Sequence, residues 1–293
     1  MSIYNKDGSL LASAFQVNGS RAEAAYNREG EWVFPDTDSN FRVMTYNVGQ
    51  WYQGDLSAVP VDKKAAYYAL QYGTFEKNPV DAVFFQEYTT KWCDDGSSAA
   101  VDFVAPFFAH QNTTTPQAGT YKGRSIATVQ DYPIANYTNH PFSDYKTSSY
   151  MNFQTAEITF EGKTIHLIDT HNDFSISYQR LEVTELLAAI EGYEYFILCG
   201  DFNQRILPGD TTNDYYQNSI QRFLDAGYTV GNGVIDWVQT YLNSASTVYK
   251  WLDQVVTSPN ISIDRIYGYH AKLTDPAVSI PDHMPLIAEL TIH

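Results

Sequence analysis

Short apolar runs of strand type, several of which stop abruptly at a polar residue, dominate the chain after residue 40. Four of these runs are rich in β-branched and aromatic residues, which predicts buried strands. Two more stretches alternate apolar and polar positions, as half-exposed antiparallel strands do. The six predicted strands lie at 41–47, 82–87, 164–171, 195–201, 125–135 and 151–160. Glu161-Gly162 predicts a hairpin turn between two of them.

Three stretches show the apolar spacing of an amphipathic helix. In 177–193, apolar residues recur at i, i+3, i+4 and i+7 from Val183, and Gly192 stands where a C-cap belongs. The stretches 214–228 and 61–73 repeat the pattern. Strand pairs interrupted by few helices predict an α/β fold of two mainly antiparallel sheets packed on each other, with the helices outside.

The first 36 residues follow a different pattern, with a period of 11. Tyr4, Phe15 and Tyr26 each begin a unit that ends in a glycine turn. We expect a short β-repeat extension over 1–36 that attaches or assembles the protein, although chance similarity in a polar leader is the alternative. A single catalytic domain then spans 37–293. The repeats weakly resemble modules appended to phage- or surface-associated bacterial proteins.

Charge and composition narrow the possible functions. The chain has 293 residues, with 18 Lys and Arg against 34 Asp and Glu, so its net charge is −16. This field repels polyanions, and no stable complex with nucleic acid is expected. Nucleic acid as a transient substrate stays possible, because a bound divalent cation can supply positive charge locally. With no signal peptide and no apolar stretch long enough for a membrane span, a cytoplasmic protein is expected.

The apolar runs share one feature that predicts chemistry. Their ends carry residues that bind metals or phosphate, namely Asn47, Glu87, His171, and Asp201 with Asn203. If these ends meet at one rim of a sandwich, they form a pocket of carboxylate, amide and imidazole groups with apolar walls. Such a pocket would hold a hard cation through its oxygen ligands.

Two further fragments extend this set. Asp253 lies among apolar residues in 251–256, and Asp282-His283 directly precedes a predicted strand. Mg²⁺ or Mn²⁺ on these carboxylates would polarise a phosphoryl oxygen, and a carboxylate would orient or deprotonate water. A histidine fixed by a buried aspartate could act as a general base or stabilise the charge on phosphorus.

In their order, these motifs resemble those of the endonuclease/exonuclease/phosphatase superfamily. Its members include pancreatic-type deoxyribonuclease, apurinic endonucleases, inositol-polyphosphate 5-phosphatases and bacterial sphingomyelinases. The resemblance covers about residues 41–293 and implies a four-layer α/β sandwich. The motifs are MTYNVG at 44–49, QE at 86–87, DTH at 169–171, GDFN at 200–203, LDQV at 252–255 and DHMP at 282–285.

The resemblance also implies a role for each motif residue. Glu87 would be the main metal ligand, helped by Asn47 and Asp282. Asp201 would align the attacking water, and Asn203 would hold a phosphate oxygen.

Two histidines would face the phosphate. His283 would do so with Asp253 behind it as its orienting partner. His171 would be a second phosphate-facing histidine, which the apurinic branch lacks. Gly49 also stands where that branch usually has an acidic residue, and both features count against abasic-site repair.

The substrate contacts depart from the family pattern. Gln130-Asp131 stand where many members have Ser-Arg, so a cationic phosphate contact is missing unless Arg124 or Arg180 replaces it. Trp51 could stack on a base or sugar, or could equally fill a loop.

Three functional hypotheses follow. The first is a divalent-metal-dependent phosphodiesterase, in particular a nuclease that cleaves DNA or RNA. The second is a phosphomonoesterase or a lipid-headgroup phosphodiesterase, because the net charge and the missing basic residues suit a small phosphate ester. The third is a non-catalytic binding protein that works through residues 1–36.

Overall fold

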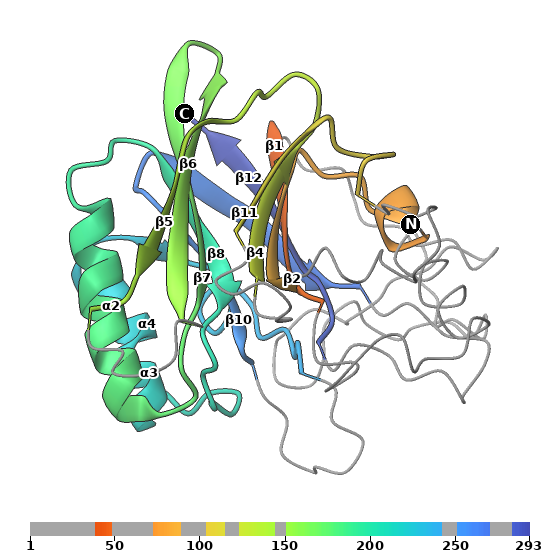
Figure 1. Ribbon diagram of the computed structural model, residues 1–293. Helices are drawn as coiled ribbons and strands as arrows, with labels where there is room; N and C mark the ends of the chain where they lie inside the picture. The colour runs from red at the N-terminus through yellow and green to blue at the C-terminus, as the bar shows by residue number, and fades with distance from the viewer. Residues whose placement is uncertain are drawn as a thin grey trace, which may run out of the picture.

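The computed structural model describes seven segments of the chain. These segments fold into a sandwich of two six-stranded sheets (Figure 1). The described segments are 39–48, 73–88, 104–114, 123–143, 151–241, 251–269 and 283–293. The β-repeat expected over 1–36, the helix expected over 61–73 apart from its last residue, and Gly49, Trp51 and Asp282 lie outside them. The extension and its assembly role stay predictions.

The first sheet has the strand order β11-β12-β1-β2-β4-β3. Only the pair β1–β2 is parallel, and every other neighbouring pair in this sheet is antiparallel. Its strands are β1 (Phe41–Asn47), β2 (Ala82–Tyr88), β3 (His110–Thr114), β4 (Gly123–Thr128), β11 (Ile261–Gly268) and β12 (Leu286–Ile292).

The second sheet has the order β5-β6-β7-β8-β10-β9 and repeats this arrangement. Its single parallel pair is β7–β8, with antiparallel pairs on both sides. Its strands are β5 (Ala135–Pro141), β6 (Asn152–Phe160), β7 (Lys163–His171), β8 (Phe196–Asp201), β9 (Thr229–Val230) and β10 (Asp253–Thr257).

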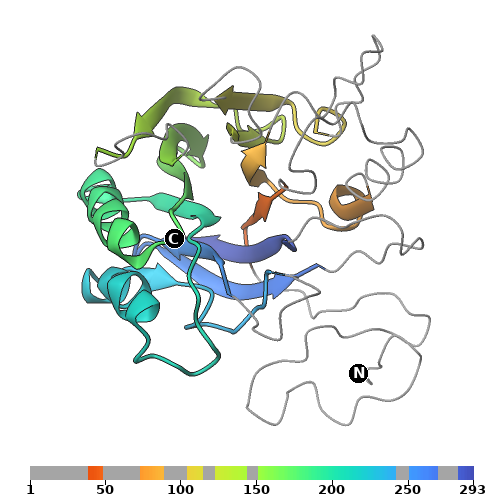
Figure 2. The same cartoon turned by 60° about the horizontal axis from the view of Figure 1, so that its bottom comes forward.

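Three helices cover the outer face of the second sheet (Figures 1 and 2). They are α2 (Ile176–Ile190), α3 (Asp214–Asn218) and α4 (Ile220–Asp225). Helix α2 buries Val183 and Leu186, which confirms the predicted helix and its apolar stripe. On the other side of the sandwich, a helical turn at 73–77 packs Phe75 against the first sheet. None of the described helices is long and apolar enough to cross a membrane.

Two sequence predictions differ from the structure. The stretch 214–228 forms two short helices because Ser219, with φ −130° and ψ −80°, interrupts it, and the buried Ser219 hydroxyl accepts a hydrogen bond from Gln204. The stretch 125–135 belongs to two strands in different sheets, since β4 ends at Thr128 and β5 begins at Ala135.

The predicted hairpin at Glu161-Gly162 is confirmed. Both residues have positive φ, +47° and +80°, as a two-residue type I′ turn requires. Phe160 and Lys163 form the pair that closes the turn, so β6 and β7 align without a bulge.

The face that each central strand turns to the opposite sheet is apolar for most of its length and polar at one end. Val43, Phe84, Leu167 and Ile197 are among the residues that form the shared apolar core. Side chains two positions apart share a face, so the polar residues at the strand ends also point between the sheets. We call this set the polar end; it comprises Thr45, Asn47, Gln86, Arg124, Asn152, Gln154, Asp169, His171, Asp201 and Asp253, all buried.

Candidate active site

Asp201 ends β8 and occupies the centre of the polar end. Its Oδ2 accepts a hydrogen bond of 3.0 Å from Asn47 Nδ2 in the other sheet, and its Oδ1 accepts one of 2.8 Å from the Asn203 backbone N–H. Gly200 precedes it because any Cβ at that position would lie 2.0 Å from the carbonyl oxygen of Thr170. The close strand pairing that positions the carboxylate therefore requires glycine.

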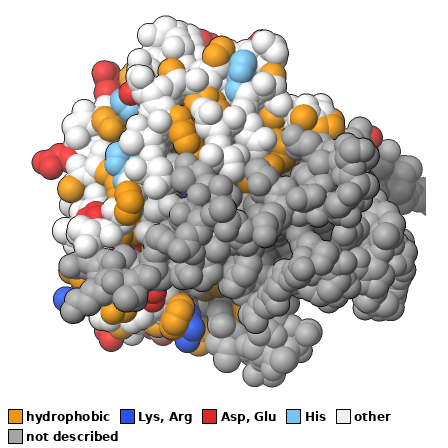
Figure 3. Space-filling model, in the orientation of Figure 1, with side chains coloured by type: hydrophobic (Ala, Val, Ile, Leu, Met, Phe, Trp, Pro, Cys, Tyr) orange, Lys and Arg blue, Asp and Glu red, His pale blue; other side chains and the backbone are white. Residues whose placement is uncertain are grey.

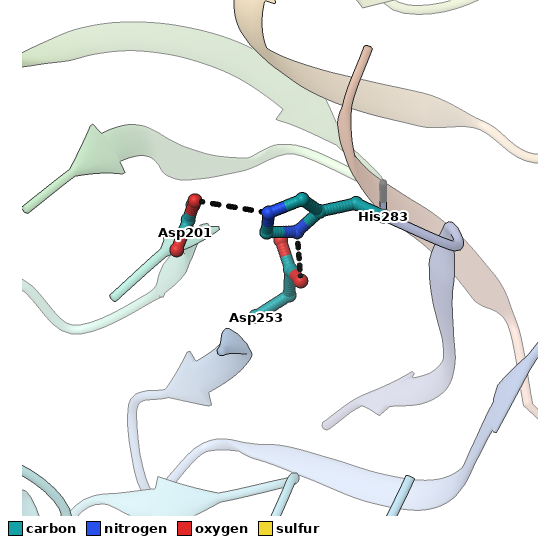
Figure 4. Close-up of side chains that lie close together, drawn as sticks. All are labelled: Asp201, Asp253 and His283. Carbon is teal, nitrogen blue, oxygen red and sulfur yellow. Dashed lines mark hydrogen bonds and ion pairs between the residues drawn. The ribbon is translucent and has the colours of Figure 1, made fainter. Parts of the chain in front are cut away.

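His283 and Asp253 form a hydrogen-bonded pair beside Asp201 (Figure 4). The distance from His283 Nδ1 to Asp253 Oδ2 is 2.8 Å, and His283 Nε2 lies 3.6 Å from Asp201 Oδ2. Asp253 is directly opposite Asp201 in the β8–β10 pairing. Because Asp253 accepts from Nδ1, it fixes the ring so that Nε2 faces Asp201.

His171 lies on the other side of Asp201. The two residues are paired in the parallel register of β7 and β8, and His171 Nε2 is 3.4 Å from Asp201 Oδ2. Both histidines thus turn Nε2 toward one carboxylate oxygen. Asp169, two residues before His171 on β7, shares its face, and Asp169 Oδ1 accepts a hydrogen bond of 2.7 Å from Gln86 across the sheets.

Asn203 lies at the rim of the site, where a left-handed backbone conformation and two hydrogen bonds fix its position. Its φ of +51° is left-handed, a conformation that asparagine tolerates better than most residues. Its Nδ2 donates to the Asn172 carbonyl at 2.8 Å, and its carbonyl accepts from Gln179 Nε2 at 3.0 Å. Asn203 therefore connects the segment after β8 to the segment after β7 and remains partly exposed.

Glu87 lies at a β-bulge near the end of β2. The pairing with β4 shifts between Gln86 and Tyr88, and Glu87 itself has φ +54°. A positive φ is uncommon for glutamate and often marks a functional position. Because Asn47 pairs with Gln86 in the parallel β1–β2 register, the bulge sets Glu87 beside the end of β1. Its side chain is 4% exposed.

The donor atoms at this end suit a hard divalent cation. Asp201, Asp253 and His283 place one donor atom each within 4.8 Å of one another. The His283–Asp253 hydrogen bond occupies Nδ1 and one carboxylate oxygen, whereas the buried Asp253 Oδ1 has no hydrogen-bond partner among the described residues. Carboxylate and amide oxygens, from Asp201, Glu87 and Asn47, are the ligands that Mg²⁺ and Mn²⁺ prefer.

Burial changes the acidity of the central carboxylate. Together with the charge of the nearby Asp253, it raises the pKa of Asp201 to about 7, although His283 and the hydrogen bonds from Asn47 and the Asn203 N–H oppose this rise. A carboxylate with a pKa near neutrality can accept a proton more readily than an ordinary aspartate.

Several supporting residues escaped the sequence analysis because they belong to no motif. Asn232 Nδ2 donates to the Asp253 carbonyl at 3.0 Å, and Thr240 Oγ1 accepts from the Asp253 N–H at 3.2 Å. Glu182 Oε2 accepts from the Asp173 N–H at 2.9 Å and steadies the segment after His171. The one feature that could have marked Glu182 in the sequence is its position on the buried face of helix α2.

The candidate substrate contacts are less well placed. The structure buries Arg124 completely between the sheets. Arg180 is an exposed residue of α2, and its charge adds to burial in lowering the pKa of Arg222. Arg124 therefore offers no open surface to a substrate, whereas Arg180 does.

Comparison with known proteins identifies the fold. No protein-family model and no curated protein matches the chain. D. rerio TDP2 in complex with a single-strand DNA product aligns with a TM-score of 0.62 at 16% identity, over 86% of this chain and 98% of that one. An endonuclease/exonuclease/phosphatase from Bacteroides vulgatus gives 0.63 at 14%, over 86% and 99%. A mannosyl-6-phosphatase from Bacteroides thetaiotaomicron gives 0.60 at 15%, over 86% and 100%.

The chain therefore has the fold of the endonuclease/exonuclease/phosphatase superfamily, a sandwich of two mixed sheets with helices outside. This confirms the fold expected from the ordered motifs.

The buried Glu182 carboxyl group should make the free energy of unfolding depend on pH. Burial raises its pKa to about 8 from an ordinary 4.5. The unfolded chain loses this proton near pH 4.5 and the folded protein keeps it to about pH 8, so the free energy of unfolding should fall by a few kcal/mol as pH rises between these values. Glu182→Gln should flatten that decline in urea unfolding, whereas the exposed Glu191→Gln should keep the parent profile. An unchanged decline in Glu182→Gln would contradict the assignment.

Proposed function

We propose that this protein is a divalent-metal-dependent phosphoester hydrolase. The observation that carries the proposal is the buried cluster in which Asp201 meets Asn47, His171 and the His283–Asp253 pair. Buried charged groups are costly unless they are paired, so their concentration at the end of an apolar sandwich indicates function rather than stability. The cluster also argues against a purely binding role through residues 1–36.

The chain's own residues support in-line attack by water on phosphorus, in which the bond to the ester oxygen opposite the water breaks as the new bond forms and the departing oxygen takes a proton from solvent. Asp201 orients the water and accepts its proton, since its Oδ1 is fixed by the Asn203 N–H and its pKa is raised by burial. His283, held by Asp253, donates a hydrogen bond from Nε2 to a phosphoryl oxygen, and His171 does so from the other side. Asn203 contributes its amide at the rim.

Glu87, Asn47 and the neighbouring carboxylates would hold the divalent cation, with Asp282 as a further expected ligand. Bound there, Mg²⁺ or Mn²⁺ would polarise a phosphoryl oxygen and offset the negative charge of the site. Both ions suit these oxygen ligands, and we propose that the protein uses one of them.

Our first candidate reaction is phosphodiester cleavage of DNA or RNA. It is supported by the ordered motif set with His171 present, which counts against the apurinic branch, and by the fold shared with a TDP2 that was crystallised with a DNA product. Repulsion from a net charge of −16 is compatible with brief contact and with no stable nucleic-acid complex.

The second candidate is hydrolysis of a small phosphate ester, either a monoester or a lipid headgroup. One observation favours it: on the described part of the face in Figure 3, red acidic groups are scattered along the edges, and only a few blue basic groups are visible. A small substrate needs no basic track. The fold shared with a mannosyl-6-phosphatase is compatible with this candidate.

A substrate panel with metal removal tests the proposal. Plasmid DNA, single strands, bis-p-nitrophenyl phosphate, sugar phosphates and an inositol phosphate are incubated with Mg²⁺ or Mn²⁺, with and without EDTA. We expect hydrolysis that EDTA abolishes and added metal restores. Cleavage of diesters supports the first candidate, and phosphate release with DNA intact supports the second. If no phosphoester is cleaved under any condition, the protein is not a hydrolase of this kind.

Substitution of Asp201 tests the assigned mechanism. Asp201→Asn keeps the shape but removes the proton acceptor, so kcat should fall by about 10²- to 10⁴-fold on whichever substrate the panel identifies. The exposed Asp264→Asn serves as the matched control and should keep parent kcat. Circular dichroism checks that both variants are folded. A kcat within twofold of the parent for Asp201→Asn rules out the role given to this carboxylate.

A further inference from the structure

Arg124 is a cation of the polar end that the mechanism above does not use. It is the largest side chain among the described residues that has no exposed surface. An arginine guanidinium remains charged inside proteins, and burying it costs free energy unless anions compensate. The surroundings of Arg124 should therefore explain why it is there.

The strand register shows where the Arg124 side chain points. Arg124 lies opposite Gln86 in the β2–β4 pairing, and two residues further along β4, Ile126 faces the core between the sheets. Arg124 therefore also faces the second sheet. Its partner Gln86 reaches Asp169 on β7 with a hydrogen bond of 2.7 Å, so the gap between the sheets is narrow enough for contact here.

The charged groups that act on Arg124 are carboxylates of the site. Asp169 acts most strongly, followed by Glu87 and Asp201, and each favours the charged guanidinium against its burial. In return, Arg124 opposes the rise in the pKa of Asp169 that burial causes. Among the described residues, the only other buried arginine or lysine is Arg265, which pairs with Glu289 between β11 and β12.

We propose that Arg124 is the internal counter-ion of the active-site carboxylates. Its fixed charge lets Glu87, Asp169 and Asp201 pack together before a divalent cation binds, and it limits how tightly that cation is then held. Arg124 is thus a positioning residue, acting through the carboxylates rather than on the substrate. The inference rests on the proposed function, because it requires a divalent cation at this end of the sandwich.

This role differs from the expectation that Arg124 contacts the substrate phosphate. The Arg124 side chain is buried between the sheets and has no exposed surface that a substrate could contact. The two roles also predict different behaviour. A phosphate ligand would change the KM for substrate and leave metal affinity unchanged, whereas a counter-ion changes metal affinity in the absence of any substrate.

Metal-dependent stability tests the proposal without relying on catalysis. Thermal unfolding of the parent and Arg124→Met is followed in EDTA and in Mg²⁺ or Mn²⁺, and Mn²⁺ binding is measured by calorimetry. In EDTA, Arg124→Met should have a lower Tm, because its buried carboxylates lack their counter-ion. With metal, its Tm should rise more than that of the parent, and its Kd for Mn²⁺ should be at least about tenfold lower, because the cation no longer meets a like charge.

Arg265→Met is the matched control, since it also removes a buried arginine from the same sheet. It should lower the Tm equally with and without metal. A second variant covers the case in which Arg124→Met does not fold in EDTA. Arg124→Met combined with Asp169→Asn removes one charge of each sign, so it should fold in EDTA and unfold at a higher temperature than Arg124→Met.

The outcomes separate this inference from the proposed function. If the parent binds Mn²⁺ but Arg124→Met shows the same Kd and the same metal-induced rise in Tm, Arg124 is an ordinary structural residue and the inference fails alone. The inference also fails if Arg124→Met and the double variant are both unfolded in EDTA. If the parent itself shows no response to divalent ions, the proposed metal-dependent function fails and the inference fails with it.

Discussion

The hydrogen bond from Asn47 to Asp201 joins the two sheets where all the described candidate catalytic residues lie. It brings together the first sheet, which carries Glu87, and the second, which carries His171 and Asp253. A buried carboxylate without such partners would cost several kcal/mol, on the order of the whole stability of a domain. The site can therefore exist only while both sheets stay packed at the polar end. The adjacent apolar core provides that packing, so the same strands supply both stability and chemistry.

The polar end follows from a simple change in the strand pattern. Each central strand keeps one face toward the other sheet, and on that face apolar residues give way to polar ones within the last few positions. Parallel pairing of β1 with β2, and of β7 with β8, places their carboxyl ends together. The antiparallel neighbour β10 contributes Asp253 from its amino end. Functional groups from sequence positions far apart thus meet without any long-range signal in the sequence beyond the abrupt end of each apolar run.

Much of this structure could be predicted from the sequence, but the features that depend on tertiary contacts could not. Strands β1, β2 and β7 lie close to their predicted ranges because their apolar runs are continuous, and the turn at Glu161-Gly162 could be predicted because Gly162 readily adopts the positive φ that the turn requires. The break at Ser219 depends on a partner, Gln204, that periodicity cannot reveal. From the sequence alone, Arg124 could be a surface residue that contacts the substrate. The sheet register shows that it faces the second sheet, and its side chain is fully buried.

A crystal of the protein soaked with Mn²⁺ and inorganic phosphate would show where both ions bind. We expect an anomalous Mn²⁺ peak beside Glu87 and Asn47, next to the polar end. We also expect a phosphate within hydrogen-bond distance of His283 Nε2 and His171 Nε2. A Mn²⁺ peak bound elsewhere on the protein, with neither ion at the polar end, would contradict the claim that these strand ends form a phosphoester-cleaving site.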